Sequence, residues 1–190
     1  MRDGRMPTAE FIIDFVDNYN EEQPFDAKSY NAAMNLVNAF PDNDNFEDIF
    51  IKVNFINGSF KTRIGDTMQV AKNIAEILDF DERINQDDIS LINDIGRYLS
   101  RKNREFNFYS FATKYCHCHK PDTFPIFDNY VKESLEYYRN NFNGMANFKS
   151  VRLRNYHSFR ETMHNFKVFA QAESINNSIV DRFLWAQSKP

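Results

Sequence analysis

The chain has 190 residues, with 20 Phe but only 5 Gly and 6 Pro, and its formal net charge is −4. This length suits one well-buried core and is short for two. Scarce Gly and Pro favour long helices over an architecture with many turns. No apolar stretch is long enough to cross a bilayer, and the N-terminus lacks the apolar run of a secretory signal. These features predict one domain and exclude a membrane-spanning protein.

The charges are distributed unevenly along the sequence. Residues 1–96 contain 8 Lys/Arg and 19 Asp/Glu, whereas residues 97–190 contain 15 and 8. The second half can therefore present a basic face, which is typical of a phosphate-binding surface. Ordinary solvated faces explain the same counts equally well, because halves of a sequence need not be faces of a molecule.

The predicted elements are almost all helices. In chain order, apolar residues recur at helical spacing in residues 9–19, 30–40, 46–60, 64–78, 89–100, 108–117 and 130–142, and in two final segments at about 158–172 and 175–185. A buried strand is the alternative for residues 46–60. Candidate N-caps are Ser29, Asp87 or Asp88, Asp128 and Ser174. The sequence thus predicts a single all-α domain with about eight or nine helices.

The breaks between these helices are short. Residues 20–27 and 41–45 are the longest predicted loops, and no segment has the composition of an interdomain linker. Residues 120–125 form a predicted turn, and Ile126 and Phe127 an extended connector.

Cys116 and Cys118 are the only two cysteines. Their spacing disfavours a disulfide and indicates a reducing compartment, so we expect a cytoplasmic protein. The segment from Cys116 to His119 (CHCH) consists of metal-ligand residue types, but its spacing does not match the two-residue gap of a zinc knuckle. We expect no metal and no cofactor, and interpret the cysteines as core fillers.

Two motifs lie between residues 110 and 135. The first is Ala112-Thr-Lys114, and the second is Phe124-Pro-Ile-Phe-Asp128 followed by a predicted helix. They resemble two elements of the helix-hairpin-helix DNA glycosylase superfamily. One is the helix that carries the nucleophilic lysine of bifunctional members, and the other delivers the invariant aspartate. The resemblance is nearest to bacterial proteins with the 8-oxoguanine DNA glycosylase fold, which have a terminal helix similar to residues 181–185.

This resemblance implies an enzyme that excises a damaged or modified base from duplex DNA. The Asp128 carboxylate would stabilise the positive charge that develops on the sugar. The Lys114 amine would attack C1′ and form a Schiff base, which would give lyase activity. The flipped base would stack on aromatic side chains.

Each assigned residue also has a simpler interpretation. Asp128 is a suitable N-cap. Lys114 lies at the edge of the apolar stripe of its predicted helix, a position that suits either the rim of a pocket or a surface lysine whose amine reaches solvent. Residues 107–111 lack the glycine-rich hairpin of the superfamily, and the interval from Lys114 to Asp128 is about one helical turn shorter than usual. A non-catalytic DNA-binding or protein-interaction module on the same fold is therefore the alternative.

Further residues are assigned to DNA by charge and by analogy. The predicted phosphate contacts are Arg97, Arg101, Lys102, Arg104 and Lys120. A solvated helix C-terminus is the alternative for the group at residues 97–104. Arg152, Arg154 and Arg160 form a second basic group. Asn57 and Ser59 would line the base pocket, or simply belong to a turn. The sequence leaves the base, the pathway and the oligomeric state open.

Overall fold

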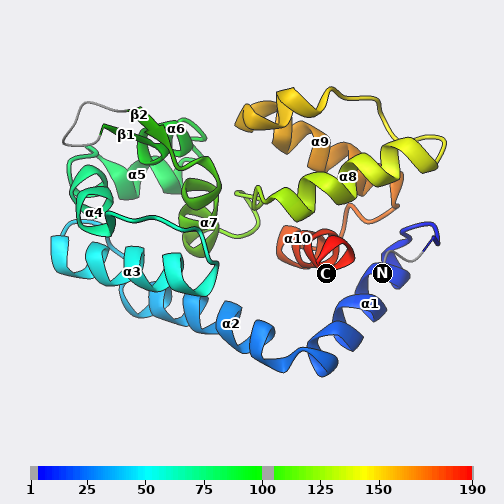
Figure 1. The fold of residues 1–190 in the computed structure, drawn as a ribbon, viewed down its shortest axis with the longest axis horizontal. Helices are drawn as coiled ribbons and strands as arrows, with labels where there is room; N and C mark the ends of the chain where they lie inside the picture. The colour runs from blue at the N-terminus through cyan, green and yellow to red at the C-terminus, as the bar shows by residue number, and fades with distance from the viewer. Residues whose placement is uncertain (1–3, 100–104, 190) are drawn as a thin grey trace. The chain divides into compact units, whose positions relative to one another are not determined.

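The computed structural model describes residues 4–99 and 105–189. These residues form ten α-helices, one 3-10 helix and one two-stranded antiparallel sheet (Figure 1). The predicted all-α class is confirmed. No helix within the described ranges is both long and apolar enough to cross a bilayer.

Contacts divide the chain into two compact units, a division that length and composition did not indicate. Unit 1 comprises Met1–Pro24 and Pro125–Pro190, and unit 2 comprises Phe25–Phe124. Unit 1 is thus assembled from two separate stretches of the sequence, because unit 2 is inserted between them. Each unit is described by itself below.

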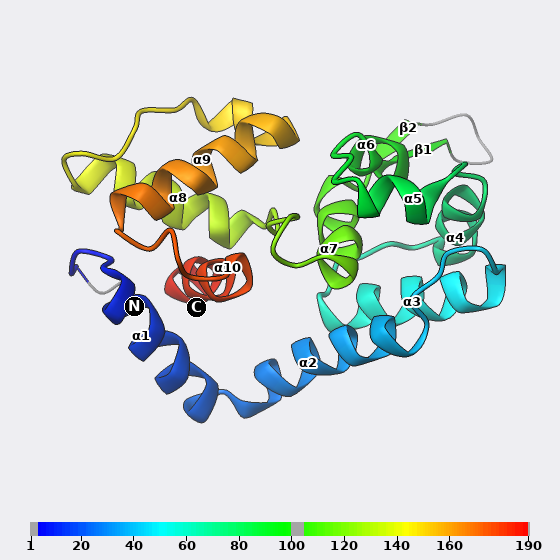
Figure 2. The ribbon, with the colours of Figure 1, turned by 180° about the vertical axis from the view of Figure 1, so that it is seen from behind.

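Unit 1 contains the first and last helices of the chain (Figures 1 and 2). Its elements are α1 (Ala9–Glu22), α8 (Asn129–Asn141), η1 (Ser150–Arg154), α9 (Tyr156–Phe169) and α10 (Asn177–Ser188). Helix α10 packs against both α1 and α8. In the core, the Tyr138 ring lies 5.4 Å from that of Phe166 and 6.1 Å from that of Phe183. Aromatic rings of α8, α9 and α10 therefore form the centre of this unit.

Unit 2 is built around α7. Its elements are α2 (Pro24–Ala39), α3 (Phe46–Ser59), α4 (Thr67–Ala75), α5 (Phe80–Asn85), α6 (Leu91–Gly96), β1 (Arg97–Leu99), β2 (Glu105–Asn107) and α7 (Tyr109–His119). Helix α7 packs against α6 and α3, and all of its residues except Ser110 and His119 are buried. A helix that is buried all round belongs to the core, so α7 is the central element of the unit.

The first two helices begin and end differently from the prediction. Residues 20–27, predicted as a loop, are mostly helical, because α1 continues to Glu22 and α2 begins at Pro24. Proline favours the first helical position because its missing N–H would be unsatisfied there anyway. Ser29 therefore lies inside α2 and is not its cap. The predicted helix at 46–60 is confirmed as α3, capped by Asn45, and its strand alternative is wrong.

The largest correction concerns the predicted helix at 89–100. Helix α6 ends at Gly96, and the chain continues into β1, whose Arg97 pairs with Asn107 of β2. A Cβ added to Gly96 would lie 3.1 Å from the Asn107 Oδ1 atom, so this approach suits glycine. Two further details were missed: the short helix α5, and Asn176 rather than Ser174 as the residue before α10.

Candidate functional site

Lys114 lies on the central helix α7 of unit 2. Its side chain is 3% exposed, and its Nζ atom donates a hydrogen bond of 2.8 Å to the Ser110 hydroxyl, one turn earlier. The prediction of a rim lysine is wrong, because neighbouring elements cover α7 on every side. The amine is therefore positioned by its own helix and held away from bulk water.

The element before α7 is a β-hairpin. Strands β1 and β2 pair antiparallel, and the N–H of Phe108 then donates to the carbonyl oxygen of Gly96 at 2.8 Å. The hairpin thus closes directly onto the start of α7.

Asp128 begins helix α8 of unit 1. Its backbone is extended, and its carboxylate accepts a hydrogen bond of 3.1 Å from the Tyr130 N–H. The predicted N-cap is thereby confirmed. The side chain is half-buried, and the preceding residues from Phe124 to Phe127 are buried. Asp128 therefore marks the point at which a buried connector reaches a helix N-terminus, where negative charge is favoured.

Two side chains fix this connector, and sequence reasoning missed both roles. The Asp181 carboxylate of α10 accepts from the Ile126 N–H at 2.9 Å, and the Tyr156 hydroxyl of α9 donates to the Pro125 carbonyl oxygen at 3.0 Å. Burial raises the pKa of Asp181 well above its usual range. The sequence held one signal for the role of Asp181, because its carboxylate falls within the apolar stripe of a predicted helix and a buried carboxylate requires a polar partner.

Lys114 and Asp128 belong to different units. Lys114 lies in unit 2, and Asp128 lies four residues after the unit boundary, in unit 1. The Lys114 amine donates to the Ser110 hydroxyl, and the Asp128 carboxylate accepts from the Tyr130 N–H.

The predicted phosphate contacts divide into three groups. Arg97 is exposed, and it is both the C-cap residue of α6 and the first residue of strand β1, which agrees with its alternative interpretation as part of a helix C-terminus. Lys120 forms an ion pair with Asp87 and donates to the Asn85 carbonyl oxygen at 2.8 Å. It is thus engaged within unit 2. Arg101, Lys102 and Arg104 lie outside the described residues.

The predicted base-pocket residues lie at the end of α3. Asn57 uses both ends of its amide within the following turn: Nδ2 donates to the Ile64 carbonyl oxygen, and Oδ1 accepts from Thr62 and from the Ile64 N–H. This supports the interpretation of Asn57 as a turn residue. Ser59 is half-buried nearby.

The CHCH segment lies within the core of unit 2. The His117 Nδ1 atom bonds the Phe124 carbonyl oxygen and Nε2 bonds the Tyr30 hydroxyl, each at 2.8 Å. A carbonyl only accepts, so Nδ1 donates and Nε2 accepts from Tyr30. Burial lowers the pKa of His117 to about 4 and raises that of Cys118 to about 12. His117 is therefore neutral and has both ring nitrogens occupied, and no group of three metal-ligand side chains occurs among the residues described.

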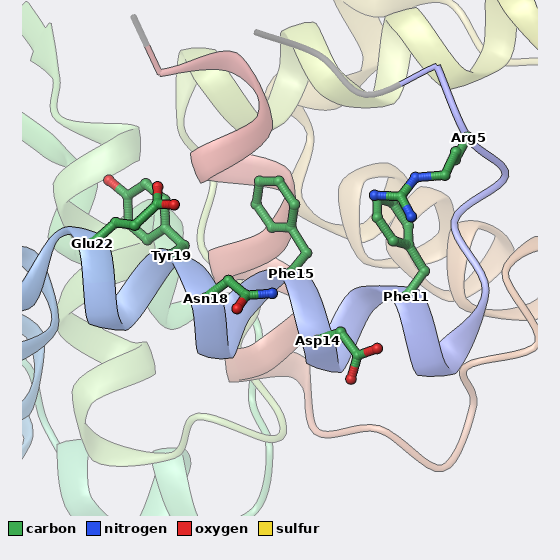
Figure 3. Close-up of a pocket in the computed structure, with 7 residues that line it drawn as sticks. All are labelled: Arg5, Phe11, Asp14, Phe15, Asn18, Tyr19 and Glu22. Atoms are coloured by element: carbon green, nitrogen blue, oxygen red, sulfur yellow. The ribbon is translucent and has the colours of Figure 1, made fainter.

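A surface pocket of about 380 Å³ lies along α1 (Figure 3). It is lined by Arg5, Phe11, Asp14, Phe15, Asn18, Tyr19 and Glu22. The Arg5 guanidinium lies over the Phe11 ring, 4.3 Å from its centroid. None of the predicted site residues lines this pocket. The carboxylates of Asp14 and Glu22 disfavour a phosphate here, so the pocket does not support the predicted DNA site.

Comparisons with known proteins identify the family. Residues 11–123 match the model of the HI_0787_N family, which is described as an N-terminal domain. The chain belongs to this family. It is also 36% identical over 143 residues to a Haemophilus influenzae protein named "Uncharacterized protein", covering 75% of this chain and 67% of that protein. No solved structure matches. The family match ends at residue 123, beside the unit boundary, so it includes Lys114 but not Asp128.

Proposed function

We propose that this protein is a DNA glycosylase-like enzyme that excises a damaged or modified base, with a Schiff-base lyase step at Lys114. In this reaction the N-glycosidic bond breaks as the Lys114 amine bonds to C1′, and the base leaves with the bonding electron pair and takes up a proton. Asp128 stabilises the positive charge on the sugar. No cofactor or metal takes part.

The observation that carries this proposal is the setting of Asp128. A carboxylate needed for catalysis has to be held in one place, and here the connector before it is fixed at Pro125 and Ile126 by side chains from two helices. A helix N-terminus is also a favourable place for a carboxylate. Both features support a fixed carboxylate at residue 128.

The setting of Lys114 adds a second argument. A lysine acts as a nucleophile when its amine is oriented and removed from bulk water. The Lys114 side chain is 3% exposed, and the Ser110 hydroxyl orients its amine. Burial of a lysine is costly and needs a compensating role, and we propose a chemical one for Lys114.

Borohydride trapping tests the lysine. Duplexes carrying 8-oxoguanine, uracil or an abasic site are incubated with the protein and reductant, and a covalent adduct is expected with at least one of them. Lys114→Met should abolish the adduct. Ser110→Ala keeps the amine and removes only its hydrogen-bond partner, so it should retain an adduct. If the adduct survives in Lys114→Met but disappears in Lys120→Met, the nucleophile is Lys120 and our assignment is wrong.

Asp128→Asn tests the carboxylate separately from the cap. Asparagine caps a helix nearly as well as aspartate, so the thermal unfolding midpoint should change little. Loss of the negative charge should lower the single-turnover excision rate about 100-fold or more. Unchanged excision in Asp128→Asn would reduce Asp128 to a helix cap and refute its catalytic role.

The alternative is a non-catalytic DNA-binding or protein-interaction module, and one observation favours it. The hydrogen bond from Lys114 to Ser110 also satisfies a lysine that only fills the core. Failure of the wild-type protein to excise or trap any modified base in a broad panel, with retained folding, would support this alternative.

A further inference from the structure

Basic side chains concentrate on η1 and the first turns of α9, in unit 1. We name this group the basic cluster, and its members are Lys149, Arg152, Arg154, His157 and Arg160. Residues 149–160 contain no Asp or Glu, so the segment carries four permanent positive charges without a compensating negative one. The cluster lies in unit 1, whereas the predicted phosphate contact Arg97 lies in unit 2.

The cluster has a defined orientation because every third side chain of its segment is anchored in the core. Leu153 and Phe159 are 0% exposed and Tyr156 is 4% exposed, so the opposite face of the segment carries the charges. Side chains three residues apart lie above one another in a 3-10 helix and are neighbours in an α-helix. His157 and Arg160 of α9 form such a pair, and Lys149 is the residue that precedes the 3-10 helix carrying Arg152.

The segment is also held at both ends. At its start, Arg139 of α8 donates to the Phe148 carbonyl oxygen at 2.7 Å and stacks over the Phe148 ring. Further along, the Tyr156 hydroxyl donates to Pro125. These contacts make the cluster a fixed platform and not a loose loop.

The charges of the cluster are uncompensated. Within the described residues, no side chain of the cluster forms an ion pair or hydrogen bond. Some cations of the same chain are paired with carboxylates, as Arg83 is with Asp88 and Asp94, and Lys132 with Glu136. A fixed group of unpaired cations creates a positive potential that attracts an anionic partner.

We propose that the basic cluster binds the phosphodiester backbone of duplex DNA without reading its sequence. The inference rests on the proposed function, because that function supplies the partner. Arginine and lysine are the side chains that contact phosphates, and such contacts position a protein on the duplex. Proteins that grip single strands stack bases on exposed aromatic rings. The aromatic rings of this segment, Tyr156 and Phe159, are buried, which favours a duplex.

The test is the salt dependence of binding to a short unmodified duplex, measured by fluorescence anisotropy from about 50 to about 200 mM salt. The triple variant Arg152→Gln, Arg154→Gln, Arg160→Gln should bind more weakly to every sequence. Because each phosphate contact releases a counterion, its log–log salt slope should be shallower than that of the wild type by about 3. Circular dichroism verifies that the variant is folded.

The matched control removes three exposed cations of unit 2: Lys61→Gln, Arg63→Gln and Lys72→Gln. It has the same net charge as the cluster variant, so a general charge effect would change both slopes equally, and that outcome would overturn the inference. Loss of binding to vesicles with phosphatidylserine but not to DNA would also overturn it, in favour of a membrane partner.

The outcome is independent of catalysis because the duplex carries no modified base. Cluster-dependent binding without any excision or trapping would refute the proposed enzyme and retain this inference. Excision that persists while the cluster variant keeps wild-type affinity and slope would refute this inference alone.

Discussion

His117 shows how burial changes the meaning of a residue type. In the sequence it is one of four adjacent metal-ligand residues, whereas in the structure it links three parts of unit 2. Its ring joins Tyr30 of α2, the turn at Phe124 and its own helix α7. The neutral tautomer with a proton on Nδ1 satisfies both hydrogen bonds, so protonation of Nε2 would break the one from Tyr30.

Acid should therefore destabilise the protein through His117. Its pKa is lowered by burial from 6.5 to about 4 in the folded state. Between these values the unfolded chain binds a proton that the folded chain does not, so stability falls as the pH falls from 6.5 to 4. The loss from this group should total about 3 kcal/mol.

The measurement is the urea unfolding free energy of wild type and His117→Gln between pH 7 and pH 4.5. The variant should be less stable at pH 7, because glutamine cannot reproduce the hydrogen bonds that the buried His117 ring makes with Tyr30 and Phe124. The difference should shrink as the pH falls, since only the wild type loses the histidine contribution. A difference that stays constant with pH would contradict this account.

At the scale of elements, the loop between α2 and α3 is held by buried polar side chains. The Lys52 Nζ atom of α3 donates to the carbonyl oxygens of Phe40 and Asp42 and to the Asn43 Oδ1 atom, at 2.8–3.0 Å. The Tyr115 hydroxyl of α7 donates to the same Asn43 oxygen at 2.6 Å. Burial lowers the pKa of Lys52 to about 8. Helices α3 and α7 thus share one anchor for this loop.

Lys52→Met should destabilise the protein by about 2–3 kcal/mol, because it removes the donor of one buried and two part-buried hydrogen bonds. Tyr115→Phe removes one hydrogen bond and should cost about 1 kcal/mol. The double variant should deviate from the sum of the two costs, since both donors share Asn43. Urea unfolding measures all three, with Lys72→Met, at an exposed position of α4, as the control. A cost for Lys52→Met no larger than that for Lys72→Met would disprove the anchoring role.

At the scale of the whole molecule, unit 1 depends on two stretches of sequence that unit 2 separates. Helix α1 packs on α10, where the rings of Phe11 and Phe15 lie 5.8 and 5.3 Å from that of Phe183. The single tryptophan, Trp185, lies on the same α10 helix. Its fluorescence therefore reports on the packing of this unit.

Adjacent isoleucines of α1 provide a matched test. Ile12 is 0% exposed and Ile13 is 42% exposed. Ile12→Ala should destabilise unit 1 by about 2–5 kcal/mol, because it removes buried methyl groups and leaves a cavity. Ile13→Ala should change stability by no more than about 0.5 kcal/mol. Trp185 fluorescence during denaturation measures both. Equal midpoints for the two variants would be incompatible with this packing of α1.

The sequence by itself determined the fold class and the features that depend on local chemistry. Helical spacing of apolar residues predicted α3, α7 and α8, and the position of Asp128 before an amphipathic stretch predicted its cap. These features depend on residues within one or two turns of each other. The chemistry assigned to Lys114 and Asp128 stays a prediction.

Only the tertiary structure decided where partners distant in sequence meet. The pairing of β1 with β2 ended α6 at Gly96, although the apolar pattern continues beyond it. Contacts between Asp181 and Ile126, 55 residues apart, fix the connector to Asp128. The burial of Lys114 likewise comes from elements packed around α7. A residue at the edge of an apolar stripe is exposed when only one face of its helix is covered. It is buried when the helix is covered all round, as α7 is.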